Sequence, residues 1–144
     1  MRILILNGPN LNWLGKREPE IYGNQGFDEI LRNLQNVFPQ IKLQYSQNNV
    51  EGELINILQD AEADTEIGGI VFNAGAYSHT SLALADTLKA MSKPVVLVHI
   101  SNVFAREIER HTDLLVANAN GLICGLGTNG YNLAIQHILL TLNQ

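Results

Sequence analysis

The chain has 144 residues, enough for one well-filled hydrophobic core, so we expect a single domain over residues 1–144. Nine Lys and Arg residues against fourteen Asp and Glu residues give a formal net charge of -5. Since no excess of positive charge is left for a nucleic acid or an anionic membrane, we expect neither as a partner. The single cysteine cannot form an intrachain disulfide, and the apolar N-terminal run is too short for a secretion signal. We therefore predict a cytoplasmic protein.

Two kinds of apolar segment alternate along the chain. Runs rich in β-branched residues predict buried strands at residues 2–7, 41–46, 67–73 and 94–100, with a weaker candidate at 121–125. Apolar residues at helical spacing predict amphipathic helices at residues 27–38, 52–63, 81–91 and 131–142. This alternation predicts an α/β protein with a flavodoxin-like three-layer fold and a five-stranded parallel sheet.

Polar residues follow the predicted strands directly. They occupy residues 7–10, 47–49, 73–79 and 99–102. Ligands of such folds bind beyond the carboxyl ends of the strands. His79 and His99 lie at the ends of neighbouring strands, and with Asn73, Ser101 and Asn102 they form a polar set that core packing does not require. We therefore predict a functional site at this edge.

One segment breaks both periodicities. Residues 15–26 include Arg17, Tyr22 and several glycines and charged residues, which predicts a mobile loop over the carboxyl edge. Cys124 lies in a short apolar run and is interpreted as a buried structural thiol. The glycine-rich residues 121–127 lack the spacing of a phosphate-binding loop. We assign no role to His111 or His137.

Six blocks of sequence, in order from end to end, resemble type II 3-dehydroquinate dehydratase. The blocks read NGPNLN at 7–12, LGKREPEIYG at 14–23, QNNVEGE at 47–53, NAGAYSHTS at 73–81, HISN at 99–102 and ICGLG at 123–127. The resemblance implies a lyase that reversibly removes water from 3-dehydroquinate, by anti elimination through an enolate, to give 3-dehydroshikimate. This is a step of the shikimate pathway to the aromatic amino acids, or of quinate breakdown.

The resemblance also implies roles for ten residues and an assembly. Tyr22 would remove the proton next to the ketone, Arg17 would favour the charged tyrosine, His99 would protonate the departing hydroxyl group, and Asn10 would hold a water near the enolate oxygen. The substrate-binding positions are Asn73, His79, Asp86, Ile100, Ser101 and Arg110. Asp86 would reach the neighbouring subunit's site in a homododecamer built from trimers. No metal and no organic cofactor is implied.

A charged tyrosine sets a physical condition on this scheme. A phenol is ionised near neutral pH only if a nearby cation acts on it where water is excluded. We therefore expect the loop at residues 15–26 to close over the substrate before Arg17 and Tyr22 become competent.

The sequence departs from the family pattern at two positions. The usual Glu-Val-His strand ending is Leu97-Val98-His99 here, and Phe104 stands where the family often has histidine. We expect His99 to lack a supporting carboxylate, to be less well oriented and less basic, and turnover to be reduced.

Two alternatives are weighed against the enzyme. A non-catalytic flavodoxin-like module, binding a mononucleotide or acting as a receiver, should carry a phosphate loop or an acidic cluster after the first strand. Residues 7–10 offer neither. A degenerate family member that binds substrate without converting it is suggested by Leu97.

Overall fold

The computed structural model describes residues 1–16, 20 and 26–144. Its five strands form one sheet in the order β2-β1-β3-β4-β5, and every pair is parallel. The strands are β1 (Arg2–Asn7), β2 (Lys42–Gln47), β3 (Ile67–Asn73), β4 (Val95–His99) and β5 (Gly121–Cys124). This order confirms the predicted flavodoxin-like fold.

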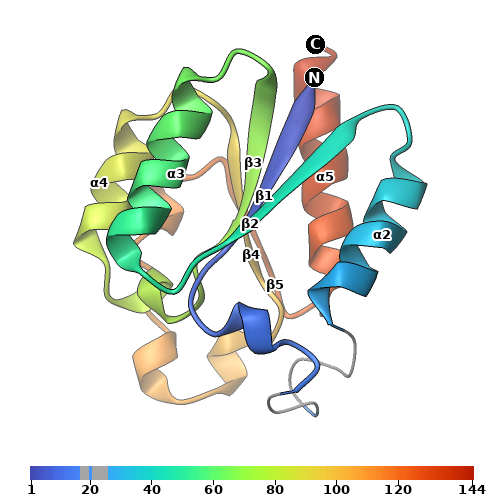
Figure 1. Cartoon of the computed structure of the whole chain (residues 1–144). Helices are drawn as coiled ribbons and strands as arrows, with labels where there is room; N and C mark the ends of the chain where they lie inside the picture. The colour runs from blue at the N-terminus through green and yellow to red at the C-terminus, as the bar shows by residue number, and fades with distance from the viewer. Residues whose placement is uncertain (17–19, 21–25) are drawn as a thin grey trace.

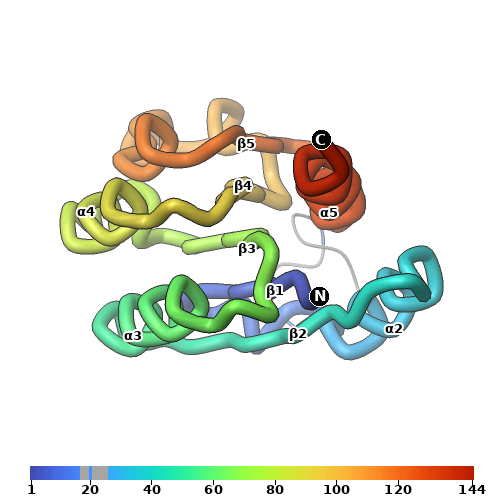
Figure 2. Tube along the Cα trace, turned by 90° about the horizontal axis from the view of Figure 1, so that it is seen from above, coloured from blue at the N-terminus to red at the C-terminus, as the bar shows by residue number. Residues whose placement is uncertain are grey.

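Helices cover both faces of the sheet, as predicted (Figures 1 and 2). On one face lie α2 (Phe27–Val37) and α5 (Asn129–Leu142), and on the other lie α3 (Glu51–Ala63) and α4 (Leu82–Ala90). The Ser81 hydroxyl accepts a hydrogen bond from the Leu84 amide at 2.9 Å and caps α4. Within the described ranges, no helix is both long and apolar enough to cross a membrane.

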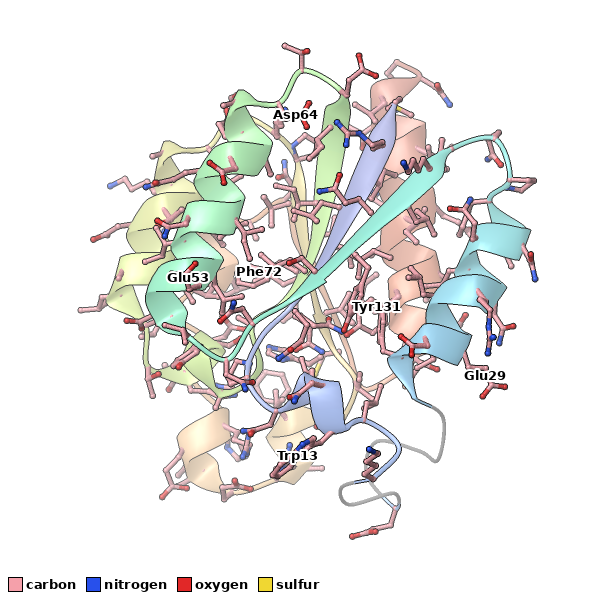
Figure 3. All side chains as sticks on the ribbon, viewed as in Figure 1. Trp13, Glu29, Glu53, Asp64, Phe72 and Tyr131 are labelled. Carbon is pink, nitrogen blue, oxygen red and sulfur yellow. The ribbon has the colours of Figure 1, made fainter. Side chains whose placement is uncertain are left out.

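The sheet separates two apolar layers. Successive side chains of a strand point to opposite faces, so Leu97 of β4 packs on the α3 and α4 side while Val96 and Val98 pack on the α2 and α5 side. Figure 3 shows Phe72 and Tyr131 on these two sides respectively. The predicted strand and helix boundaries agree with the observed ones to within two residues, because the apolar patterns in the sequence reflect this burial.

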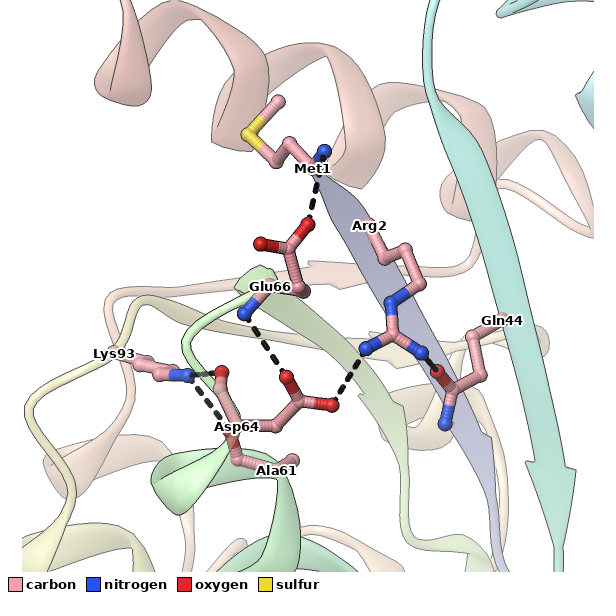
Figure 4. Close-up of polar contacts among 7 residues, drawn as sticks. All are labelled: Met1, Arg2, Gln44, Ala61, Asp64, Glu66 and Lys93. Carbon is pink, nitrogen blue, oxygen red and sulfur yellow. Dashed lines mark hydrogen bonds and ion pairs between the residues drawn. The ribbon is translucent and has the colours of Figure 1, made fainter.

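The amino-terminal edge of the sheet is held by a polar cluster (Figure 4). Arg2 Nη2 lies 2.7 Å from Asp64 Oδ2, and Arg2 Nη1 donates to Gln44 Oε1 at 2.9 Å. Lys93 Nζ donates to the carbonyl oxygens of Ala61 and Asp64. These contacts join β1, β2 and the connection from α3 to β3 at the end of the sheet opposite the carboxyl edge.

The connection from β4 to β5 begins at the carboxyl edge, at the lower end of Figure 1, and returns to the amino-terminal end of β4, where the Asn120 amide donates to the Val95 carbonyl oxygen at 2.8 Å. It contains three short 3-10 helices, η3 (Val103–Ala105), η4 (Ile108–Arg110) and η5 (Val116–Asn118). The Leu114 amide donates to the Ser78 carbonyl oxygen at 2.8 Å, and Leu115 is fully buried beside α3 and α4. The connection is therefore anchored over the ends of β3 and β4.

Candidate active site

A small cavity of about 40 Å³ lies beyond the ends of β3 and β4. Its walls are formed by Asn73, Gly75, His79, His99, Ile100, Ser101, Val103, Arg106 and Arg110. Six of the ten residues predicted from the sequence are among them. Two depressions of about 200 Å³ lie elsewhere, one beside α2 and α5 and one beside β2 and α3. Because their walls contain no histidine, arginine or lysine, the smaller cavity is the stronger candidate for chemistry.

His99, the last residue of β4, is paired with a carboxylate. Its Nε2 atom lies 2.9 Å from Asp113 Oδ2, and the two side chains are only 6% and 9% exposed. Burial alone would raise the pKa of Asp113, but the hydrogen bonds from His99 and from the amides of Leu115 and Val116 outweigh it and hold that pKa below its ordinary value. The carboxylate is therefore charged and accepts, which makes Nε2 of His99 the donor.

The expectation that His99 lacks a supporting carboxylate is therefore wrong. The family's usual acid is missing at Leu97, whose side chain is 2% exposed in the apolar layer beneath α3 and α4. Asp113 reaches the ring instead from the connection between β4 and β5. The expected loss of orientation at His99 rests on the missing acid at position 97, so the contact with Asp113 removes its basis, while the reduced turnover stays a prediction.

His79 ends the 3-10 helix η2 (Gly75–His79) and lies beside His99. The two rings are stacked, with centroids 5.8 Å apart and planes inclined by 15°. His79 Nδ1 is 2.7 Å from the carbonyl oxygen of Thr112, which can only accept, so Nδ1 carries a proton. The neighbouring residues Thr112 and Asp113 thus contact both histidines.

Asn73, the last residue of β3, has both ends of its amide fixed. Its Nδ2 donates to the Tyr131 hydroxyl at 2.9 Å, and its Oδ1 accepts from the Gly75 amide at 3.1 Å. Tyr131 donates in turn to Asn7 Oδ1 at 2.8 Å. Close packing of the strand ends also needs Gly8, where a Cβ atom would lie 2.5 Å from the Ala74 carbonyl oxygen.

Two guanidinium groups give the cavity a cationic wall. Arg110 was predicted, and its Nε donates to Glu107 Oε1 at 2.5 Å. This hydrogen bond lowers the pKa of the Glu107 carboxyl. Arg106 was not predicted, although it precedes Arg110 by four residues and follows the site segment 99–102, a spacing that could have indicated it. Arg106 Nη1 lies 3.3 Å from Ser101 Oγ.

The other predicted site residues lie elsewhere or are not described. Asn10 has a left-handed backbone with φ of 69° before η1 (Leu11–Trp13), and its amide donates to Asn49 Oδ1 at 3.0 Å. Asp86 is exposed on α4, and neither Asn10 nor Asp86 belongs to the cavity wall. Arg17 and Tyr22, with most of the predicted loop, lie outside the described residues. Cys124 is partly exposed rather than buried, and its thiol donates to the Ser101 carbonyl oxygen at 3.5 Å.

Comparison with known proteins agrees with this architecture. Residues 1–139 match the family described as Dehydroquinase class II. A 3-dehydroquinate dehydratase of Idiomarina loihiensis is 48% identical, over 99% of this chain and 94% of that protein. One of Bacillus licheniformis is 47% identical, over 99% and 98%. The crystal structure of a type II dehydroquinase from Butyrivibrio crossotus has a TM-score of 0.92 at 40% identity, over 96% of this chain and 97% of that one. The chain therefore belongs to the class II dehydroquinase family, as the resemblance in its sequence predicted.

Proposed function

We propose that the chain is a 3-dehydroquinate dehydratase, a lyase that converts 3-dehydroquinate to 3-dehydroshikimate in the shikimate pathway. One observation carries the proposal beyond family membership. Two histidines, two arginines and an oriented asparagine converge on one cavity at the carboxyl edge. Guanidinium groups suit a carboxylate, and amide and imidazole groups suit ring hydroxyl groups, so the wall suits an anionic polyhydroxylated ring.

The proposed reaction is an elimination with two proton transfers. The Tyr22 phenolate accepts the proton from the carbon next to the ketone, and the electron pair moves into an enolate. The enolate then expels the hydroxyl group, which takes a proton from His99 and leaves as water. Arg17 stabilises the phenolate, and a water held by Asn10 stabilises the enolate oxygen. Among the described residues, His99 supports this scheme, because it lies in the cavity wall and its Nε2 atom contacts the Asp113 carboxylate.

Binding is assigned to the walls around His99. Arg110, Asn73 and His79 contact hydroxyl groups of the ring, while the segment at Ile100 and Ser101 binds the carboxylate side. Asn73 is suited to this role because its amide is already oriented by Tyr131 and Gly75. A preoriented amide loses less conformational entropy when the substrate binds.

Asp86 belongs to a proposal about assembly. Its side chain projects from the exposed surface of α4, and we assign it to the site of a neighbouring subunit in a homododecamer of trimers. We place this assembly in the cytoplasm, as the single cysteine suggests. Sizing by light scattering should give twelve chains, whereas a stable monomer would contradict the assembly.

The activity is tested by adding 3-dehydroquinate and following the absorbance of the conjugated enone. Wild-type protein should produce the signal, and His99→Ala should lose nearly all of it. Glu29→Gln is a suitable control because Glu29 is exposed on α2, away from the cavity wall (Figure 3). A folded wild type that binds 3-dehydroquinate without producing the enone would instead indicate a degenerate member.

A further inference from the structure

We propose that Asp113 is the positioning residue of His99: its carboxylate holds the ring with a proton on Nε2 and stabilises the imidazolium, so that Nδ1 exchanges the proton with the substrate. The exchange of this proton with the substrate rests on the proposed function. The protonation state of His99 does not depend on that function and can be measured separately.

The two carboxylate oxygens of Asp113 have different partners. Oδ1 accepts from the amides of Leu115 and Val116 at 2.8 and 3.1 Å, and Oδ2 faces Nε2 of His99 at 2.9 Å. Because Oδ1 is committed to two backbone donors, the carboxyl group cannot turn away without leaving them unpaired. Oδ2 is therefore fixed in direction, as a residue that orients an imidazole ring requires.

The backbone on both sides of Asp113 is also anchored. The Thr112 carbonyl oxygen is bonded to His79, the Leu114 amide to the Ser78 carbonyl oxygen, and the Leu115 side chain is completely buried. These three attachments, on both sides of Asp113, place the carboxylate before any substrate arrives. Such preorganisation lowers the cost of charging a nearby group during a reaction.

The charges around the cavity show why His99 needs this partner. Among the described residues of the wall, the ionisable groups other than His99 are His79, Arg106 and Arg110, and none is acidic. On the neighbouring strand β5, Cys124 is the register partner of His99, and its thiol is directed to the Ser101 carbonyl oxygen. Arg106 and Arg110 both pair with Glu107, at 3.8 and 2.5 Å, and this carboxylate is 53% exposed and outside the wall. Asp113 is the carboxylate that contacts the His99 ring, so it is the counter-charge for an imidazolium at His99.

Asp113→Asn tests the proposal sharply. The side-chain oxygen of the introduced asparagine should remain with the amides of Leu115 and Val116, which turns its NH2 group toward Nε2 of His99. Nε2 must then accept, so both the required tautomer and the imidazolium are disfavoured. We expect kcat to fall about 10- to 100-fold, with KM changed by less than about twofold and the alkaline limb of the kcat profile moved to lower pH, because the counter-charge of the imidazolium is lost.

Controls separate positioning from general damage. Asp64→Asn removes a paired carboxylate at the opposite edge of the sheet (Figure 4) and should leave kcat and its pH profile unchanged. Asp113→Ser removes the charge without presenting an NH2 group to His99, so its loss of kcat should be smaller than that of Asp113→Asn. A rise in KM with an unchanged kcat profile would show that Asp113 only supports the loop, and would overturn the proposal.

Nitrogen NMR of the imidazole provides a readout independent of turnover, with His99→Ala used to assign the signals. In wild-type protein, neutral His99 should carry its proton on Nε2, and in Asp113→Asn the proton should move to Nδ1 while the ring titrates at lower pH. A wild-type neutral ring protonated on Nδ1 contradicts the proposal even if the variants do not fold. If the tautomer is as expected but no enone forms from 3-dehydroquinate, the proposed function fails and the pairing stands.

Discussion

The Tyr131 hydroxyl accepts a hydrogen bond from Asn73 Nδ2 at 2.9 Å, in a part of the core that solvent does not reach. The phenol belongs to α5, and the amide stands at the end of β3. Burial raises the pKa of Tyr131 well above its ordinary value, so the hydroxyl group is neutral and can both accept from Asn73 and donate to Asn7. A helix on one face of the sheet thus orients a residue of the cavity wall.

Tyr131→Phe should therefore affect both stability and substrate binding. It leaves the side chains of Asn7 and Asn73 without their hydroxyl partner, which should lower the free energy of unfolding by about 1–3 kcal/mol. Asn73 is then less firmly oriented, so KM for 3-dehydroquinate should rise severalfold while kcat changes less. Urea unfolding and steady-state kinetics measure the two effects.

Tyr45→Phe is the matched control for this change. The Tyr45 ring stacks on Phe27 with centroids 4.5 Å apart, and its hydroxyl receives only a long bond of 3.5 Å from Asn7. Removing this partly exposed hydroxyl should alter stability by less than about 1 kcal/mol. Equal losses in the two variants would contradict a special role for Tyr131.

Leu97→Glu restores the glutamate that the family usually has at this position, but we do not expect it to support His99. The side chain of Leu97 lies in the apolar layer with Leu4 and Leu115, and His99 already has Asp113. A buried, uncompensated carboxylate should cost about 3–5 kcal/mol of stability and should not raise kcat. Leu97→Met, which conserves volume, should cost less than about 1.5 kcal/mol. A folded Leu97→Glu enzyme with a higher kcat would show that Asp113 is an incomplete substitute.

The contrast between Leu97 and Asp113 shows what the sequence could predict. Local burial patterns indicated the strands and helices, since Val96, Leu97 and Val98 are all buried by layers on both faces of the sheet. The sequence also indicated the site segments, because parallel strands all end at one edge of the sheet and ligands bind there. Asp113 could not be found in this way, because it reaches His99 across 14 residues of sequence through a connection of short 3-10 helices. Such a connection has no periodicity that predicts its path.

Arg106 should contribute to binding the anionic substrate. Its guanidinium group lines the cavity and contacts Ser101 Oγ, so Arg106→Ala should raise KM at least about tenfold, consistent with loss of a charge-assisted hydrogen bond. Arg106→Lys should recover only part of this loss because lysine lacks the planar guanidinium fork. Arg32→Ala, at an exposed position of α2, should leave KM unchanged. An unchanged KM in Arg106→Ala would remove Arg106 from the binding site.

The Asp113 pair should also contribute to the pH dependence of stability. The pKa of Asp113 is lower in the folded protein than its ordinary value of 3.8, so the unfolded chain takes up this proton first as the pH falls. The stabilisation is therefore fully present well above pH 3.8 and is lost as the pH falls through the lower folded pKa.

Urea unfolding at a series of acidic pH values should show a shallower fall in stability for Asp113→Asn than for wild type. Glu53→Gln, at an exposed site on α3 (Figure 3), should follow the wild-type curve. Identical slopes for all three proteins would mean that the carboxylate of Asp113 gains no net stability from His99 and the two amides.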